Sequence, residues 1–95
     1  MRHAEKFAAL RDCVLNGPGV VDQSIRAAAF QGTGVPDDLA SYVDKVVKHA
    51  YKVTDSDIER LKAAGYSEDA IFEITVAAAV GVGIRRYEAG MKAMQ

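Results

Sequence analysis

Three polar residues of this sequence are of the types that catalyse reactions on small anionic substrates: His49, Glu73 and Arg85. The imidazole of His49 changes its charge near neutral pH and can move a proton. A buried carboxylate at Glu73 would serve as a general base, and the guanidinium of Arg85 would hold an anionic substrate through paired hydrogen bonds. We therefore assign His49 and Glu73 as candidate catalytic residues and Arg85 as a candidate substrate-binding residue.

Each of these residues also has an ordinary structural role open to it. His49 comes near the expected carboxyl end of a helix, where a protonated imidazole interacts favourably with the helix dipole. Glu73 is simply solvated if it faces water, because charged residues are seldom buried without a partner. Arg85 can form an ion pair with Glu88 or with a neighbouring subunit. The residue types alone leave both interpretations open.

Cys13 is the only cysteine of the chain. A single cysteine makes no intrachain disulfide, no Cys-x-x-Cys pair and no cysteine-only metal site. We expect Cys13 to be a small core residue near the end of the first helix. As a peroxidatic nucleophile it would need an external thiol. The sequence predicts no metal site and no cofactor.

The composition is that of a small protein with nearly balanced charge. The 95 residues include 12 basic and 13 acidic side chains, and the pI is near 6.1. This length predicts one domain over residues 1–95, and the charge balance lacks the basic excess of nucleic-acid-binding proteins. The first residues contain no apolar stretch of the kind that directs secretion, so we expect a cytoplasmic protein.

Helical signals alternate with chain-breaking residues along the whole sequence. Apolar residues recur at helical spacing, and Gly-Pro-Gly, Gly-Thr-Gly and Ala-Gly-Tyr segments separate the periodic stretches. Asp22 offers an alternative, later start for the second helix. No stretch alternates in the manner of a strand, so we predict an all-α fold. The expected helices cover residues 2–15, 20–31, 36–50, 54–64 and 67–94.

The last expected helix, residues 67–94, is the longest and the most apolar. The eleven residues from Ile74 to Ile84 carry no charge, and a helix that is apolar all round is buried on every side. Because this stretch is too short to cross a bilayer, we expect it to form the central helix of a soluble core or of an oligomer interface. Gly81 and Gly83 each cost about 1 kcal/mol relative to alanine inside a helix. Two such glycines favour the close approach of another backbone.

This apolar helix also predicts self-association. A chain this short buries only roughly 60–65% of its unfolded surface, and its other helices can cover one or two sides of residues 67–94. We therefore predict an obligate homo-oligomer, in the first place a dimer, joined through this helix. The alternative is that the glycines pack inside one chain against residues 36–50. We expect no nucleic-acid and no membrane partner, and a small-molecule ligand is left open.

The start of the fourth expected helix carries a recognisable polar pattern. Thr54 and Asp57 have the spacing of a capping box, with aspartate in place of the usual glutamate. Asp57 can also pair with Arg60, three residues further along the same helix.

The segment from Val53 to Ala79 resembles the carboxymuconolactone decarboxylase superfamily, which includes alkylhydroperoxidase D. The shared unit is a short helix, an Ala-Gly-aromatic-Ser turn and a long alanine-rich helix, and the resemblance covers residues 39–94. It implies an alkylhydroperoxidase D-like bundle of about five helices that assembles into dimers, trimers or hexamers.

Redox-active members of that superfamily carry a Cys-x-x-Cys pair and a histidine four residues after the second cysteine. His49 matches this histidine, which places the two cysteine positions at Tyr42 and Lys45. Neither sulfur is present. An alternative register places the cysteine pair upstream of Leu39, where no cysteine pair exists either, and Cys13 matches no position of the family. The resemblance thus implies the scaffold without the thiol chemistry.

Three functions are compatible with these residues, in this order of preference. The first is a non-redox, oligomeric member of the superfamily that either has no catalysis or binds a small apolar or anionic molecule between helices. The second is a cofactor-free lyase of the decarboxylase type, which a pocket lined by His49 and Glu73 would favour. The third is a peptide-binding module, because residues 61–74 also resemble part of a ubiquitin-associated domain. An exposed apolar patch around Gly65 and Tyr66 would favour that module.

Overall fold

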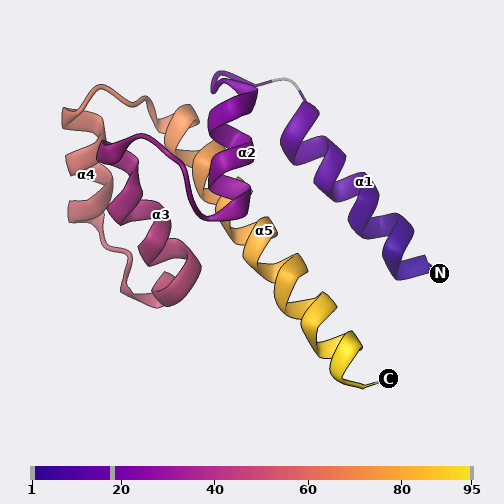
Figure 1. Ribbon diagram of the computed structural model, residues 1–95. Coiled ribbons are helices and arrows are strands. Elements are labelled where there is room, and N and C mark those ends of the chain that lie inside the picture. Colours follow the sequence, from indigo (N-terminus) through magenta and orange to yellow (C-terminus); the bar gives the residue numbers. More distant parts are fainter. Residues whose placement is uncertain (1, 18, 95) are drawn as a thin grey trace.

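The computed structural model describes residues 2–17 and 19–94, with side chains from Glu5 onward. Within these ranges the chain is helical and contains no strand, as the sequence predicts (Figure 1). The elements are α1 (Arg2–Asn16), α2 (Gln23–Gln31), α3 (Asp37–His49), the 3-10 turn η1 (Ala50–Lys52), α4 (Asp55–Ala63) and α5 (Glu68–Ala93).

Local side-chain capping accounts for the starts of α4 and α5, whereas the cap residues of α2 and α3 make no side-chain cap hydrogen bond. Thr54 and Asp57 form the predicted capping box at the start of α4, and the Ser67 side chain accepts a backbone N–H at 3.1 Å at the start of α5. α2 begins at Gln23, so the later of the two predicted starts, with Asp22 in the cap position, is confirmed. The turn η1 was not predicted.

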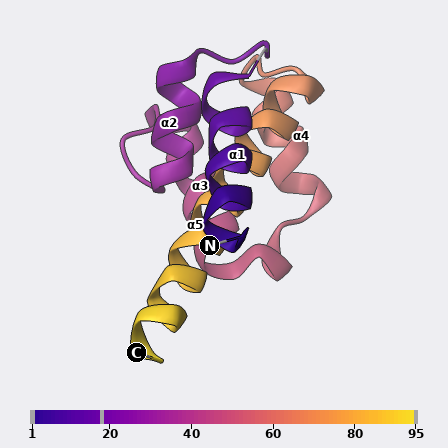
Figure 2. The same ribbon diagram turned by 90° about the vertical axis from the view of Figure 1, so that its right-hand side faces the viewer.

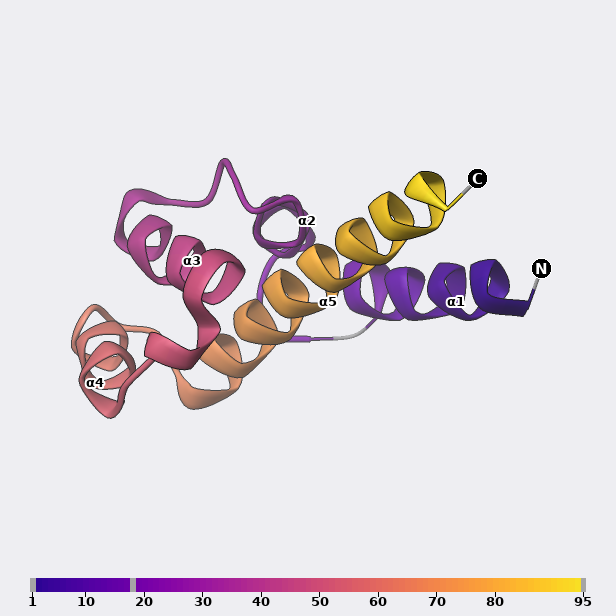
Figure 3. The same ribbon diagram turned by 90° about the horizontal axis from the view of Figure 1, so that it is seen from below.

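The other helices pack against α5. α1, α2 and α3 lie around it, and α4 lies beside α3 near the amino-terminal end of α5 (Figures 1 and 3). Figure 2 shows the last turns of α5 extending past its neighbours, in a molecule that measures 46 × 28 × 20 Å. The buried core cluster comprises Val21, Ala29, Leu39, Tyr42, Val43, Val46, Leu61, Ile71, Ile74, Ala77 and Ala78.

Two hydrogen bonds show that α3 and α5 run in the same direction. The Tyr42 hydroxyl lies 2.6 Å from the Thr75 hydroxyl. Further along both helices, Arg86 donates to the carbonyl oxygen of Val47 at 3.2 Å. Val47 lies about 7.5 Å beyond Tyr42 along α3, whereas Arg86 lies about 16.5 Å beyond Thr75 along α5, so the long side chain of Arg86 spans the difference.

The end of α2 approaches α5 closely at Gly81. A Cβ atom placed on Gly81 would collide with the backbone carbonyl of Phe30, at the end of α2. The guanidinium of Arg85, one turn further along α5, donates to the same carbonyl oxygen at 2.5 Å. Gly81 therefore lets the end of α2 lie directly on α5, and Arg85 satisfies a carbonyl that the helix end leaves without an intrahelical partner.

One chain alone does not bury the stretch from Ile74 to Ile84 on every side, because Ala79 and Gly83 are exposed. Burial of the remaining side in an oligomer stays a prediction. Gly81 approaches α2 rather than residues 36–50, and a Cβ at Gly83 would meet no atom within 4 Å. The sequence reveals that a helix is apolar all round, but not how many neighbours a short chain has available to cover it.

Gly81→Ala is expected to destabilise the protein. The added methyl group would push against the Phe30 backbone, and overpacking of this kind costs about 1–3 kcal/mol. The matched control is Gly90→Ala in the same helix, where the new Cβ would meet nothing within 4 Å and the helix propensity of alanine favours folding by up to about 1 kcal/mol. Urea unfolding at one protein concentration measures both changes. Equal stability of the two variants would contradict the close approach of α2.

Candidate functional site

His49 lies at the carboxyl end of α3, and its side chain is exposed. Its ring meets the ring of Tyr51 edge to face, with a centroid distance of 5.9 Å. Tyr51 is itself 80% exposed. The structure therefore places this candidate base on the surface and not in a cavity. Its position at a helix end agrees with the prediction from the sequence.

Glu73 lies in the second turn of α5 and is half-buried. Its two carboxylate oxygens accept the backbone N–H groups of Val20 and Val21 at 2.8 and 3.0 Å. A Cβ on Gly19 would collide with the same carboxylate. Glu73 is thus bound to the segment that leads into α2, and both of its oxygens are engaged in holding that backbone.

Arg85 is half-buried, and its guanidinium is directed at the Phe30 carbonyl at the end of α2. Glu88, the partner suggested by the sequence, lies instead 3.8 Å from Arg11 of α1. The described contact of Arg85 is therefore with the backbone of its own chain.

The structure does not bring the three candidates together. Glu73 and Arg85 are twelve residues apart on one continuous helix, which separates them by roughly 18 Å along its axis. His49 lies at the end of α3 against the ring of Tyr51, whereas Glu73 is bound to the segment that leads into α2. The catalytic and binding roles of these residues remain predictions, without a shared cavity to support them.

Three shallow grooves have been identified between the helices. One of about 210 Å³ lies between α3 and α4, one of about 220 Å³ between α2 and the start of α5, and one of about 150 Å³ between α1 and α5. None of these three is lined by His49 or Arg85, and Glu73 lines only the smallest. The pocket that would favour the lyase, lined by both His49 and Glu73, is not among them.

The smallest groove contains two residues whose environment sequence reasoning missed. Cys13 is exposed there, so the expectation of a core cysteine is wrong. Arg26 is only 6% exposed, and its Nη1 donates to the carbonyl oxygen of Gly17 at 2.6 Å, near the end of α1. Its buried Nε has no hydrogen-bond partner. Nothing in the spacing of Arg26 distinguishes it from a surface arginine.

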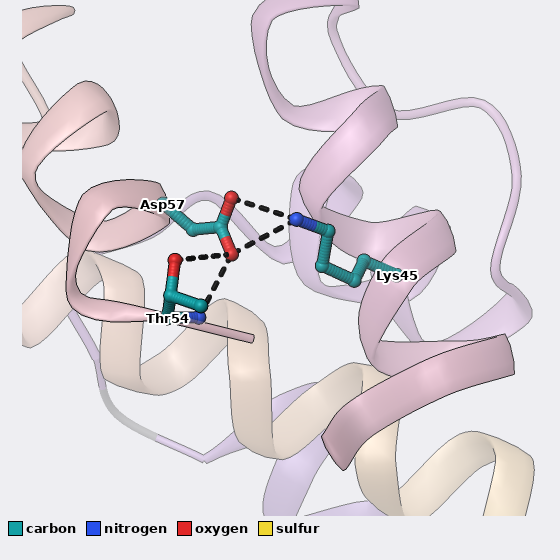
Figure 4. Close-up of polar contacts among 3 residues, drawn as sticks. All are labelled: Lys45, Thr54 and Asp57. Carbon is teal, nitrogen blue, oxygen red and sulfur yellow. Dashed lines mark hydrogen bonds and ion pairs between the residues drawn. The ribbon is translucent and has the colours of Figure 1, made fainter. Parts of the chain in front are cut away.

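Asp57 forms the most connected polar cluster (Figure 4). Lys45 Nζ lies 2.9 and 3.0 Å from its two carboxylate oxygens. One of these oxygens also accepts the backbone N–H of Thr54 at 2.9 Å and its hydroxyl at 3.3 Å. The hydrogen bonds from Lys45 and then from Thr54 hold the pKa of Asp57 below its usual value. The spacing allows Asp57 to pair with Arg60, but the ion pair that Asp57 forms with Lys45 joins α4 to α3 instead.

The two positions that the family resemblance assigns to cysteines are both structural here. Tyr42 is buried and bonds to Thr75 of α5, and Lys45 bonds to Asp57 of α4. Each side chain ties α3 to a neighbouring helix. No group of histidine, cysteine, aspartate and glutamate side chains that could hold a metal ion occurs in the part of the chain that the structure describes.

Comparisons with known proteins assign no family: no family model, no curated protein and no solved structure matches this chain. The superfamily resemblance therefore remains a prediction that depends on the residues from Val53 to Ala79. In residues 2–17 and 19–94, no helix is long and apolar enough to cross a membrane.

Glu73→Ala is expected to destabilise the protein by about 1–3 kcal/mol, because two backbone N–H groups lose their charged acceptor. Glu73→Gln keeps one acceptor oxygen and should lose less. Glu88→Ala, in the same helix, removes only a long ion pair between exposed side chains and should stay within about 0.5 kcal/mol of the parent. Urea unfolding compares the three variants. A neutral Glu73→Ala would show that the contact is not structural and would restore the catalytic interpretation.

Asp57→Asn is expected to weaken the pH dependence of stability in acid. Because the pKa of Asp57 lies below its ordinary value of 3.8 in the folded chain, its contribution is fully present above that value and is lost as the pH falls through the folded pKa. Urea unfolding between pH 7 and pH 2 should show a shallower decline for the variant. High salt screens the exposed Glu68–Lys62 pair, whose contact also lowers the pKa of Glu68, and so separates the two contributions. Parallel pH profiles would contradict this assignment.

Proposed function

We propose that this chain is a non-redox, homo-oligomeric helical protein of the carboxymuconolactone decarboxylase and alkylhydroperoxidase D-like superfamily, located in the cytoplasm. It acts through its helix surfaces, by assembly and by binding a small apolar or anionic molecule, and not through thiol chemistry. The helix, turn and long helix formed by residues 55–93 agree with the arrangement that the resemblance implies.

One observation carries this proposal. The two residues at the expected cysteine positions, Tyr42 and Lys45, hold α3 against α5 and α4 through half-buried hydrogen bonds. A position used in this way supports the scaffold and offers no reactive group to a substrate. Glu73 and Arg85 are likewise engaged with backbone groups of their own chain.

The two other functions receive less support. A decarboxylase-type lyase needs its base and its anion-binding group around one substrate, whereas Glu73 and Arg85 lie about 18 Å apart along α5. A ubiquitin-associated-like module needs an exposed apolar patch at the Ala-Gly-Tyr turn. Tyr66 is half-buried there, and its hydroxyl donates to Asp38 at 2.7 Å.

We expect no disulfide-based peroxidase activity. After oxidation of Cys13, the chain has no second thiol that could resolve the sulfenic acid. A steady-state assay with an organic hydroperoxide and a dithiol reductant should give the protein-free rate, and Cys13→Ser should behave identically. Turnover well above that rate, abolished by Cys13→Ser, would overturn the non-redox assignment.

A further inference from the structure

One face of α5 is only partly covered, because α1 borders it along the smallest groove and no helix that the structure describes lies over the rest of it. Phe72, Val76, Ala79 and Gly83 follow one another at spacings of four, three and four residues, so they lie on one side of the helix. We call these four residues the open face. Phe72 is 67% exposed, Ala79 and Gly83 are exposed and Val76 is half-buried. The open face therefore presents a large aromatic ring near one end and a bare backbone near the other.

The two ends of the open face carry opposite charges. Asp69 lies three residues before Phe72, and Arg86 lies three residues after Gly83. Both side chains are exposed. Among the described residues neither forms an ion pair, and Arg86 only donates to the Val47 carbonyl. A partner that matches this surface has to offer a cation opposite Asp69 and an anion opposite Arg86.

A second copy of the chain offers that pattern when its α5 runs in the opposite direction. We propose that two copies pair through their open faces, with the α5 helices antiparallel about a two-fold axis between Ala77 and Ala78. In this register Phe72 of each copy packs on Gly83 of the other, Val76 lies opposite Ala79, and Asp69 lies opposite Arg86. The proposal rests on the self-association proposed above and specifies its surface and register.

Size and charge both favour the antiparallel register. The position of a Cβ on Gly83 has no atom within 4 Å, which leaves room for the ring of Phe72. A parallel pair would instead set Phe72 against Phe72, Asp69 beside Asp69 and Arg86 beside Arg86. Like charges placed opposite one another oppose association, and parallel helix dipoles add to that repulsion. An antiparallel pair is also closed by its symmetry and adds no further copies.

Cysteine cross-linking in a Cys13→Ser background tests the register. Val76→Cys and Ala79→Cys lie close to the proposed axis and should form intermolecular disulfides on mild oxidation. Phe72→Cys and Gly83→Cys lie roughly 16 Å along the helix from their own symmetry mates, too far for a disulfide. Neither should cross-link alone, whereas a chain with both substitutions should cross-link strongly. In a parallel pair, all four single variants would cross-link.

Sedimentation of the same variants separates the possible failures. A dimer in which Phe72→Cys alone cross-links as fast as Val76→Cys would overturn the register and leave self-association standing. A dimer in which none of the variants cross-links would place the interface elsewhere. A monomer at every concentration would overturn self-association as well. Charge reversal tests the register independently. Asp69→Arg and Arg86→Asp should each raise the dimer dissociation constant about tenfold, and the double variant should regain most of the lost affinity.

Discussion

The contact of α2 with α5 at Gly81 determines how the rest of this molecule is arranged. Because Gly81 has no side chain, the end of α2 rests on α5 at the Phe30 carbonyl, and Arg85 bonds to that carbonyl. α3 then occupies the neighbouring side of α5 through Tyr42 and Thr75, and α1 packs along α2 and α5. Helices of 9 to 15 residues cannot surround a helix of 26. One face of α5 therefore stays open.

Several charged side chains of this protein bind the ends of its short helices. Every helix end leaves backbone groups without intrahelical partners, and a chain with five helices in 95 residues has many of them. Arg85 donates to a carbonyl at the end of α2, and Arg26 donates to a carbonyl near the end of α1. Glu73 accepts a backbone N–H from the segment that joins α1 to α2. Residues that looked suited to catalysis are thus largely accounted for by backbone groups of the same chain. The exposed surfaces of the helices are therefore better candidates for function than these polar residues.

More of the fold than of the candidate site could be predicted from the sequence. Helix boundaries depend on neighbours in sequence: the capping box of Thr54 and Asp57, the cap at Ser67 and the left-handed Gly32 are all local signals. Local patterns do not predict which helices meet. That arrangement determines the partner of Gly81, the burial of Arg26 and the exposure of Cys13. The sequence alone does argue against a shared site for Glu73 and Arg85, because twelve residues on one predicted helix separate them by about 18 Å.

The central claim is that the face of α5 left open by the chain's own helices is covered by another copy. The dependence of the thermal midpoint on protein concentration tests it most directly, because association with the folded state alone stabilises that state by mass action. A hundredfold increase in concentration should raise the midpoint measurably, and Phe72→Ala should remove most of that rise while the chain still folds. A midpoint that stays constant over the same range, in a folded protein, would contradict the account.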